Sequence, residues 1–327
     1  MKAAWYEKNG AARDVLVVGD MPVPESGAGE VRVRLSVSGA NPSDVKSRMR
    51  RPLAYQRIVP HSDGAGVIDA VGDGVPASRI GERVWLWNGQ WKRAFGTAAK
   101  FIALPAEQAV PLDENTDFSA GACMGIPGLT AMKAVRLSEP CRGKTILVTG
   151  AAAAVGHYVT QIATLRGARV IGTASAMRAG HARDAGAAEV IDYQSEDVAA
   201  RVKELTGGRG VDAIIDMDFS STAKLLPEGV LTPYGHFICY GSNVAGDVPL
   251  NFPAMLWGNL TLQMFVVYEL TTDDRAATIA DLQALLREGR LKHTIGARYR
   301  LDDIVEAHEA VEGGKVIGNV VVDVGRG

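Results

Sequence analysis

Apolar and polar residues alternate in short runs through the first 110 residues of the chain. Residues 31–37 read VRVRLSV, and GVIDAV (66–71) and RVWLW (83–87) are similar. A period of two residues is typical of strands with one buried face. Turn residues such as Pro42 and Pro60 separate the runs. We therefore expect a mostly β body here, with no helix longer than about three turns.

After about Asn115 the pattern changes to continuous apolar runs that alternate with helical segments. Val155, Val159 and Ile162 fall on one helical face, and a capped helix is expected over 195–206. The predicted strands are 145–149, 169–172, 190–193, 213–216 and 237–240. Strands that alternate with helices indicate a parallel sheet.

Beyond about Val267 the chain returns to mixed elements. An amphipathic helix is predicted over 274–287, a strand over 297–301, a helix over 302–311 and a strand over 320–324. Periodicity alone does not assign this tail to either of the preceding regions.

Length, charge and cysteine content narrow the class of protein. A chain of 327 residues, 47% of them hydrophobic, favours two domains. A formal charge of −2 gives no overall field that would attract nucleic acid or an anionic membrane. The start lacks an apolar signal core, and Cys123, Cys141 and Cys239 are too few for a disulfide framework. We expect a soluble, cytoplasmic protein.

The segment KTILVTGAAAAVGHYVTQIA (144–163) has the order strand, small-residue turn, helix. The N-terminus of that helix directs free N–H groups at the turn, where a diphosphate can bind. Small residues from Gly150 to Ala154 let a phosphate approach the backbone, and Gly156 lets the helix pack closely on the sheet. The alternative is an ordinary strand-to-helix turn.

The end of the second predicted strand distinguishes the two nicotinamide dinucleotides. An acidic residue there would bind both ribose hydroxyls and repel a 2′-phosphate. GTASAMRAGHARD (172–184) has no acid at that point and offers Thr173, Ser175 and Arg178 instead. An arginine suits a phosphate, so NADPH is favoured over NADH. The alternative for Arg178 is a solvated helix residue.

Further motifs extend over nearly the whole chain. They are GANPSD (39–44), SDGAGVIDAVGDGV (62–75), GERVW (81–85), GACMGIPGLTA (121–131), LVTGAAAAVG (147–156), GARVIGT (167–173), DAGAAEVIDY (184–193), GRGVDAIID (208–216) and AHEAVEGGKVIGNVVV (307–322). Together they resemble the zinc-independent, zeta-crystallin-like quinone oxidoreductase family of the medium-chain dehydrogenase/reductase superfamily.

The resemblance implies an α/β protein with two domains. Residues 1–118 and 267–327 would form a GroES-like β-barrel substrate domain, and 119–266 a Rossmann domain with a doubly wound parallel sheet. The FICYGS strand (237–242) would lie at the far side of that sheet and pair across a two-fold axis, giving a homodimer or homotetramer.

The resemblance also implies the roles of particular residues. Arg178 and Tyr193 would hold the 2′-phosphate of NADPH. The implied cofactor-binding set is Asn41, Thr130, Ala152, Ala153, Ala154, Val155, Gly156, Thr173, Ser175, Arg178, Tyr193, Gly241, Ser242, Phe265, Val266, Val267, Lys315 and Asn319. The implied catalytic set is Asn41, Lys46 and Thr130.

The chain departs from the family pattern at several positions. Ala153 and Ala154 replace glycines, which would strain any position that needs a positive φ. Lys46 stands where many quinone reductases have tyrosine, which leaves substrate choice open. DMDFSST (216–222) and Tyr240 also differ from the family pattern, and nothing in the sequence indicates what these changes select.

No zinc site is expected. Ser43 and Ser62 occupy the regions where zinc-dependent relatives have cysteine and histidine, and His61 is a lone histidine without partner ligands. Without a metal, reduction of an activated acceptor is favoured over alcohol oxidation. Asn41 and Lys46 are candidate donors to the acceptor oxygen. Alternatively, Asn41 serves only to form the turn before Pro42, and Lys46 is an ordinary solvated surface residue.

Three functions remain. The first is an NADPH:quinone reductase acting on a small-molecule quinone. The second is an NADPH-dependent reductase of α,β-unsaturated carbonyls or acids, for which Lys46 and the arginines at 48, 50, 51 and 57 would be anion partners. The third is RNA binding or a crystallin-like structural role, disfavoured as the main function by the near-neutral charge and the missing aromatic platform.

Overall fold

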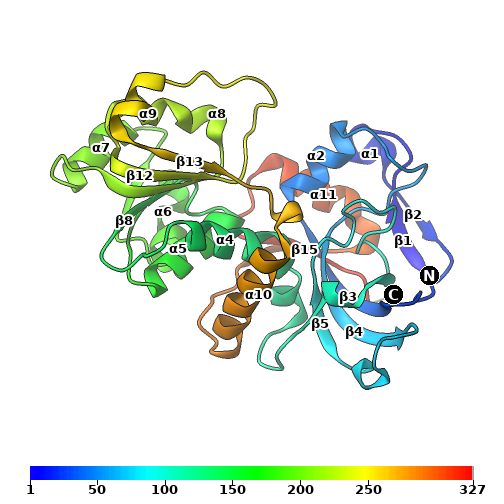
Figure 1. Cartoon of the computed structure of the whole chain (residues 1–327). Coiled ribbons are helices and arrows are strands. Elements are labelled where there is room, and N and C mark those ends of the chain that lie inside the picture. Colours follow the sequence, from blue (N-terminus) through cyan, green and yellow to red (C-terminus); the bar gives the residue numbers. More distant parts are fainter. Residues whose placement is uncertain (326–327) are drawn as a thin grey trace. The chain divides into compact units, whose positions relative to one another are not determined.

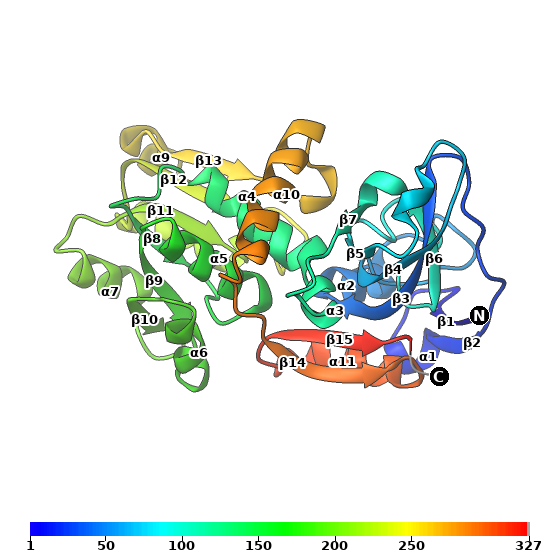
Figure 2. The same ribbon diagram turned by 90° about the horizontal axis from the view of Figure 1, so that it is seen from below.

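The computed structural model describes residues 1–325 and divides into two compact units. Unit 1 comprises Met1–Ile126 and Leu286–Gly327, and unit 2 comprises Pro127–Leu285. The domain boundaries expected from the sequence stay predictions, and their last two residues, 326 and 327, lie outside the described residues. Figures 1 and 2 show the elements of each unit from two directions.

Unit 1 is built on a mostly antiparallel sheet with the strand order β14-β15-β3-β4-β5-β7, and β6 pairs with β3. Its strands are β3 (Glu30–Ala40), β4 (Asp63–Val71), β5 (Arg83–Leu86), β6 (Phe101–Pro105), β7 (Ala109–Pro111), β14 (Ile295–Arg300) and β15 (Asn319–Asp323). The C-terminal β15 runs antiparallel to β3, with Val320 opposite Ala40. Strands from the N-terminal and the C-terminal parts of the chain therefore belong to one sheet.

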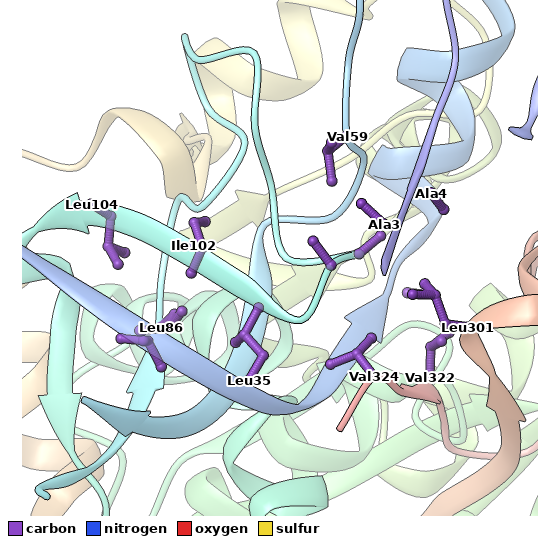
Figure 3. Packing of buried hydrophobic residues seen from close by; sticks show 14 of the residues in the cluster. Ala3, Ala4, Leu35, Val59, Leu86, Ile102, Leu104, Leu301, Val322 and Val324 are labelled. Atoms are coloured by element: carbon purple, nitrogen blue, oxygen red, sulfur yellow. The ribbon is translucent and has the colours of Figure 1, made fainter. Parts of the chain in front are cut away.

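The core of unit 1 follows from the alternation along β3. Val31, Val33 and Leu35 are buried and meet apolar residues of β4, β5, β6 and β15. Figure 3 shows Leu35 among Leu86, Ile102 and Val324. The two-residue period in the sequence thus corresponds to one buried face of this sheet.

Smaller elements complete unit 1. They are the β1 (Lys2–Trp5) and β2 (Val17–Asp20) hairpin and the helices α1 (Ala12–Val15), α2 (Pro42–Arg50), α3 (Phe118–Gly121) and α11 (Ile304–Gly313). Helix α11 packs against α1 and α2 (Figure 1). Helix α2 begins with Asn41 as its N-cap, in a capping box with Asp44.

Unit 2 is a parallel sheet with the strand order β10-β9-β8-β11-β12-β13. The strands are β8 (Thr145–Val148), β9 (Arg169–Ala174), β10 (Glu189–Asp192), β11 (Val211–Asp216), β12 (Leu231–Cys239) and β13 (Thr261–Met264). The order reverses between β8 and β11, as in a doubly wound nucleotide-binding fold.

Helices cover both faces of this sheet (Figure 1). The helices of unit 2 are α4 (Leu129–Leu137), α5 (Ala154–Leu165), α6 (Ala179–Asp184), α7 (Val198–Leu205), α8 (Phe219–Thr222), α9 (Phe252–Gly258) and most of α10 (Thr272–Arg287). Side chains of α7, α8 and α9 pack on one face, while α5 packs on β8 and β9 with α4 and α6 beside it. Ion pairs Lys133–Asp274 and Arg136–Asp281 join α10 to α4.

Two expectations about unit 2 are wrong. The FICYGS segment is not at the edge of the sheet, because β12 pairs with β11 on one side and with β13 on the other. The expected helix over 195–206 begins only at Val198, since Ser195 donates to Asp192 in a turn and Asp197 is the N-cap.

Among residues 1–325, no helix combines the length and the apolar character needed to cross a lipid bilayer.

Candidate functional site: a cavity at the switch point of unit 2

A cavity of about 840 Å³ opens at the carboxyl ends of the strands of unit 2. Thr149 follows β8, Thr173 is the last but one residue of β9 and Met217 follows β11, and all three line the cavity. Ligands of doubly wound sheets bind at this point, where strands on either side lead into helices on opposite faces. The cavity is therefore our candidate cofactor site.

The turn between β8 and α5 has the backbone that a phosphate needs. Gly150 adopts φ +62°, and a Cβ added there would lie 2.0 Å from the Met217 sulfur. A Cβ on Gly156 would lie 2.1 Å from the Gly150 oxygen. Both glycines are thus required, and the Gly150 N–H donates to the Thr173 hydroxyl at 3.1 Å.

The alanines of the turn are not strained. Ala153 is the N-cap of α5 with φ −81°, and neither it nor Ala154 is among the residues with positive φ. The strain expected from replacing glycines is therefore absent. Ala152 and Ala153 line the cavity, while Ala154 and Val155 begin α5.

The residues expected to select the dinucleotide lie on the wall of this cavity. Ser175, Arg178 and Tyr193 line it together with Thr173. The acidic lining residues Glu196, Asp197, Asp218 and Glu228 come from other segments, and none directly follows β9. A guanidinium beside a small-residue turn at a helix N-terminus fits a dinucleotide with an additional phosphate.

Asp218 and Asn243 are among the lining residues that were not anticipated. Asp218 accepts from the backbone N–H and side-chain amide of Asn243, at 2.8 and 2.9 Å, and from Ser220 and Ser221. Burial acts to raise the pKa of Asp218, but the hydrogen bonds from Ser220, Asn243 and Ser221 outweigh it and lower the pKa. Asp218, in the DMDFSST segment where the chain differs from the family, thus holds the loop after β12 in place through its hydrogen bonds to Asn243. The signal in the sequence was its position directly after a parallel strand.

The other expected residues of unit 2 do not line this cavity. Gly241 and Ser242 follow β12, and Phe265, Val266 and Val267 follow β13, with the Phe265 N–H bonded to the Cys239 oxygen at 3.1 Å. Thr130 is buried in α4. Their roles toward a cofactor stay predictions.

Asn41, Lys46, Lys315 and Asn319 belong to unit 1, and their roles also stay predictions. Asn41 is buried and donates from Nδ2 to Asp63 Oδ2 at 2.9 Å. Asn319 donates from Nδ2 to the Thr294 oxygen at 3.2 Å. Lys46 and Lys315 are exposed.

Two buried carboxyls flank Asn41. Burial raises the pKa of Asp44 to about 7, although hydrogen bonds from Asn41 act to lower it. Burial and the neighbouring Asp44 raise the pKa of Asp63 well above its usual range. Both groups therefore keep their protons to a higher pH than exposed aspartates do.

His61 is not a lone histidine, contrary to the expectation. Its Nε2 lies 3.0 Å from Nε2 of His308, and the two rings are within 20° of parallel, with centroids 5.1 Å apart. The partner histidine comes from α11, 247 residues away, and no pattern near His61 indicates it. Within residues 1–325, no cluster of three or more His, Cys, Asp or Glu side chains is arranged to hold a metal ion.

The basic segment of α2 and the following loop is less available than the sequence suggested. Arg48 is fully buried and pairs with Glu312, and Arg57 pairs with Glu7 at 2.7 Å. Arg51 stacks on Trp91, 5.0 Å from the ring centroid. Lys46 and Arg50 are exposed cations of this segment.

The chain matches two family models, which together cover most of its length. Residues 27–114 match the alcohol dehydrogenase GroES-like domain, and residues 185–322 match the zinc-binding dehydrogenase family.

Curated relatives and solved structures match over nearly full length. Quinone oxidoreductase of Rattus norvegicus is 31% identical and covers 89% of this chain and 88% of its own. 2-Haloacrylate reductase of a Burkholderia species is 28% identical over 98% of both chains. A mycobacterial protein solved in complex with NADPH is 30% identical, with a TM-score of 0.86 over 99% of this chain and 100% of its own.

Proposed function

Because the chain belongs to the zinc-independent quinone oxidoreductase family of the medium-chain dehydrogenase/reductase superfamily, we propose that it is an NADPH:quinone reductase. The chief support is the cavity of unit 2, where the phosphate turn and Arg178 line one space. Bound NADPH supplies the hydride. The preference for NADPH over NADH rests on Arg178 and on the absence of an acid directly after β9.

We assign distinct tasks to the residues of each unit. Backbone N–H groups at the start of α5 bind the diphosphate, and Arg178 neutralises the 2′-phosphate. In unit 1, Asn41 has a second Nδ2 hydrogen besides the one bonded to Asp63, and Lys46 is an exposed ammonium. Both are suited to stabilise negative charge on the acceptor oxygen, while solvent supplies the proton.

The test is NADPH consumption by the purified, chelator-treated protein with a naphthoquinone, run beside an enone and with NADH as control. We expect fast quinone reduction that prefers NADPH and survives chelation. Turnover that stops on chelation, or an absence of quinone turnover, would contradict the proposal.

The second candidate is a reductase of α,β-unsaturated carbonyls or acids. It is favoured by the similarity to the 2-haloacrylate reductase and by the exposed Lys46, five residues after Asn41. Arg48 and Arg57 do not add to this argument, because both are engaged with carboxylates. Faster turnover of a 2-haloacrylate than of the quinone, reduced selectively in Lys46→Met, would favour this function.

We also propose that the protein is a homo-oligomer whose subunits pair through β13. Helix α9 packs against the neighbouring strand β12 and precedes this edge strand in the chain. Its Trp257, Phe252 and Leu256 are exposed, Trp257 by 82%. An open strand edge beside an apolar patch is suited to pair with a second copy. Light scattering should give at least a dimer, reduced to a monomer by Trp257→Asp and not by Ile80→Asp, a change in unit 1. A monomeric parent protein would refute this.

The buried thiols Cys123, Cys141 and Cys239 fit a reducing cytoplasm, where we propose that the enzyme works.

A further inference from the structure

Unit 1 contains a chain of five fully buried polar residues: Thr97, Ser38, His61, His308 and Arg48. Ser38 Oγ lies 2.7 Å from Thr97 Oγ1 and 2.8 Å from His61 Nδ1. The two histidines meet at 3.0 Å, and Arg48 Nε reaches His308 Nδ1 at 3.4 Å. We call this set the Thr97–Arg48 chain.

The direction of every hydrogen bond in the chain follows from its Thr97 end. Thr97 Oγ1 donates to the carbonyl oxygen of Asp63, which can only accept. Thr97 must then accept from Ser38, and Ser38 must accept from His61. The proton of His61 is therefore on Nδ1, and its Nε2 accepts from His308.

The Arg48 end of the chain gives the same hydrogen-bond directions independently. A guanidinium only donates, so Nδ1 of His308 must accept and its proton must be on Nε2. One arrangement of protons thus satisfies every bond, with both histidines neutral. Burial agrees with this, since it lowers the pKa of His61 to about 3 and that of His308 well below its usual range.

A contribution to the stability of the fold does not by itself explain why the Thr97–Arg48 chain is polar. Replacement of both partners of a buried hydrogen bond by apolar residues of similar shape can leave stability nearly unchanged, and the same is often true of buried ion pairs. His61 also has φ +75°, a backbone conformation unfavourable for any residue with a Cβ. A strained residue held by its surroundings indicates a positional requirement.

The chain fixes one end of helix α2. Arg48, in the last turn of α2, also donates to the Gly10 oxygen and pairs with Glu312 of α11. At the other end, the N-cap Asn41 donates to Asp63. The N-terminal end of α2 is therefore bonded to Asp63, and its C-terminal end is linked through His308 to His61. Since His61 and Asp63 are two residues apart, both ends of α2 are held by the same segment at the start of β4.

We propose that the Thr97–Arg48 chain positions α2 for the reduction, so that His61 and His308 are positioning residues that set Asn41 and Lys46 toward the acceptor. This inference rests on the proposed function, which assigns the acceptor to Asn41 and Lys46. The histidines act through α2 and do not touch the substrate.

The first test is independent of activity. Long-range ¹H–¹⁵N spectra of the labelled full-length protein near neutral pH should show neutral His61 protonated at Nδ1 and neutral His308 protonated at Nε2. An imidazolium at either residue, or the opposite tautomers, would refute the chain.

The second test compares His308→Leu with His308→Gln. Leucine removes both links, whereas the glutamine amide can accept from Arg48 and donate to His61. At saturating NADPH, we expect His308→Leu to lower kcat/KM for the quinone about tenfold. The dissociation constant for NADPH, whose proposed site is in unit 2, should stay unchanged. His308→Gln should recover turnover to within about threefold of the parent protein.

Equal losses in the two variants, or parent-like turnover in His308→Leu, would overturn the proposal. The parent protein in the same assay tests the proposed function separately. If the parent protein reduces no quinone, the NMR resonance of the Asn41 side-chain amide tests the positioning of α2 instead. It should shift in His308→Leu and stay in place in His308→Gln. Should His308→Leu not fold, Thr97→Val interrupts the other end of the chain, with Thr97→Ser as its matched control.

Discussion

Polar residues line an open cavity in unit 2, whereas in unit 1 they lie in the core and bond to one another. Arg178, Ser175 and Tyr193 face a space of about 840 Å³. His61, His308 and Arg48 are fully buried and satisfy each other. The first arrangement is suited to recognise a charged ligand, and the second to fix the position of a backbone segment. Cofactor affinity and acceptor turnover should therefore respond to mutations in different units.

The largest expected effect is on the phosphate turn. In Gly156→Ala the new Cβ would lie 2.1 Å from the Gly150 oxygen, so the turn or the helix must move. NADPH affinity, measured by fluorescence titration, should fall at least about a hundredfold. Gly180→Ala is the matched control, because a Cβ there meets nothing within 4 Å. Parent-like affinity in Gly156→Ala would exclude this turn as the diphosphate site.

A smaller effect is expected at Arg178. Loss of a charge-assisted bond to phosphate should weaken NADPH binding about ten- to thirtyfold in Arg178→Ala and leave NADH binding unchanged. Arg183→Ala removes an exposed arginine that does not line the cavity, and it should bind both cofactors normally. Equal losses of affinity for NADPH and NADH in Arg178→Ala would show that Arg178 does not bind the 2′-phosphate.

The smallest effect concerns the pH dependence of stability in unit 1. Asp44 has a folded-state pKa raised to about 7, so folding takes up a proton and stability falls as pH rises from about 4 to 7. Asp44→Asn mimics the protonated form and keeps an acceptor for the Asn41 N–H. Thermal unfolding should show the variant more stable than the parent above pH 7, by at least about 1 kcal/mol, and similar near pH 4.

Asp212→Asn provides the contrasting control in unit 2. Its hydrogen bond from Arg209 lowers the pKa of Asp212, so this carboxyl stabilises the fold above its unfolded pKa and the benefit is lost in acid. The variant should therefore lose stability near neutrality. An unchanged pH profile in Asp44→Asn would contradict the assigned state of that carboxyl.

The sequence was most informative where function depends on local order. The strand, turn and helix of 144–163 and the segment around Arg178 could be predicted, because successive residues form each of them. The period of two in VRVRLSV likewise predicted a half-buried strand. Helix and strand ends were less certain, since Asp197 rather than Ser195 caps α7.

Contacts between distant segments could not be predicted in this way. His61 and His308 are 247 residues apart, and nothing local to either one indicates the other. Met217, Asp218 and Asn243 reach the cavity only because parallel strands end at one side of the sheet. The edge strand β13 has only four residues, and three of them are exposed, so periodicity did not distinguish it from a loop.

The most direct test is a single turnover of the enzyme loaded with NADPH, chelator-treated and mixed with a naphthoquinone. The NADPH absorbance should disappear in one fast phase, at a rate unaffected by the chelator. The phase should be slower in His308→Leu at full NADPH occupancy, and Arg178→Ala should instead lower the occupancy. Absence of NADPH oxidation by the quinone, or loss of it on chelation, would contradict the account.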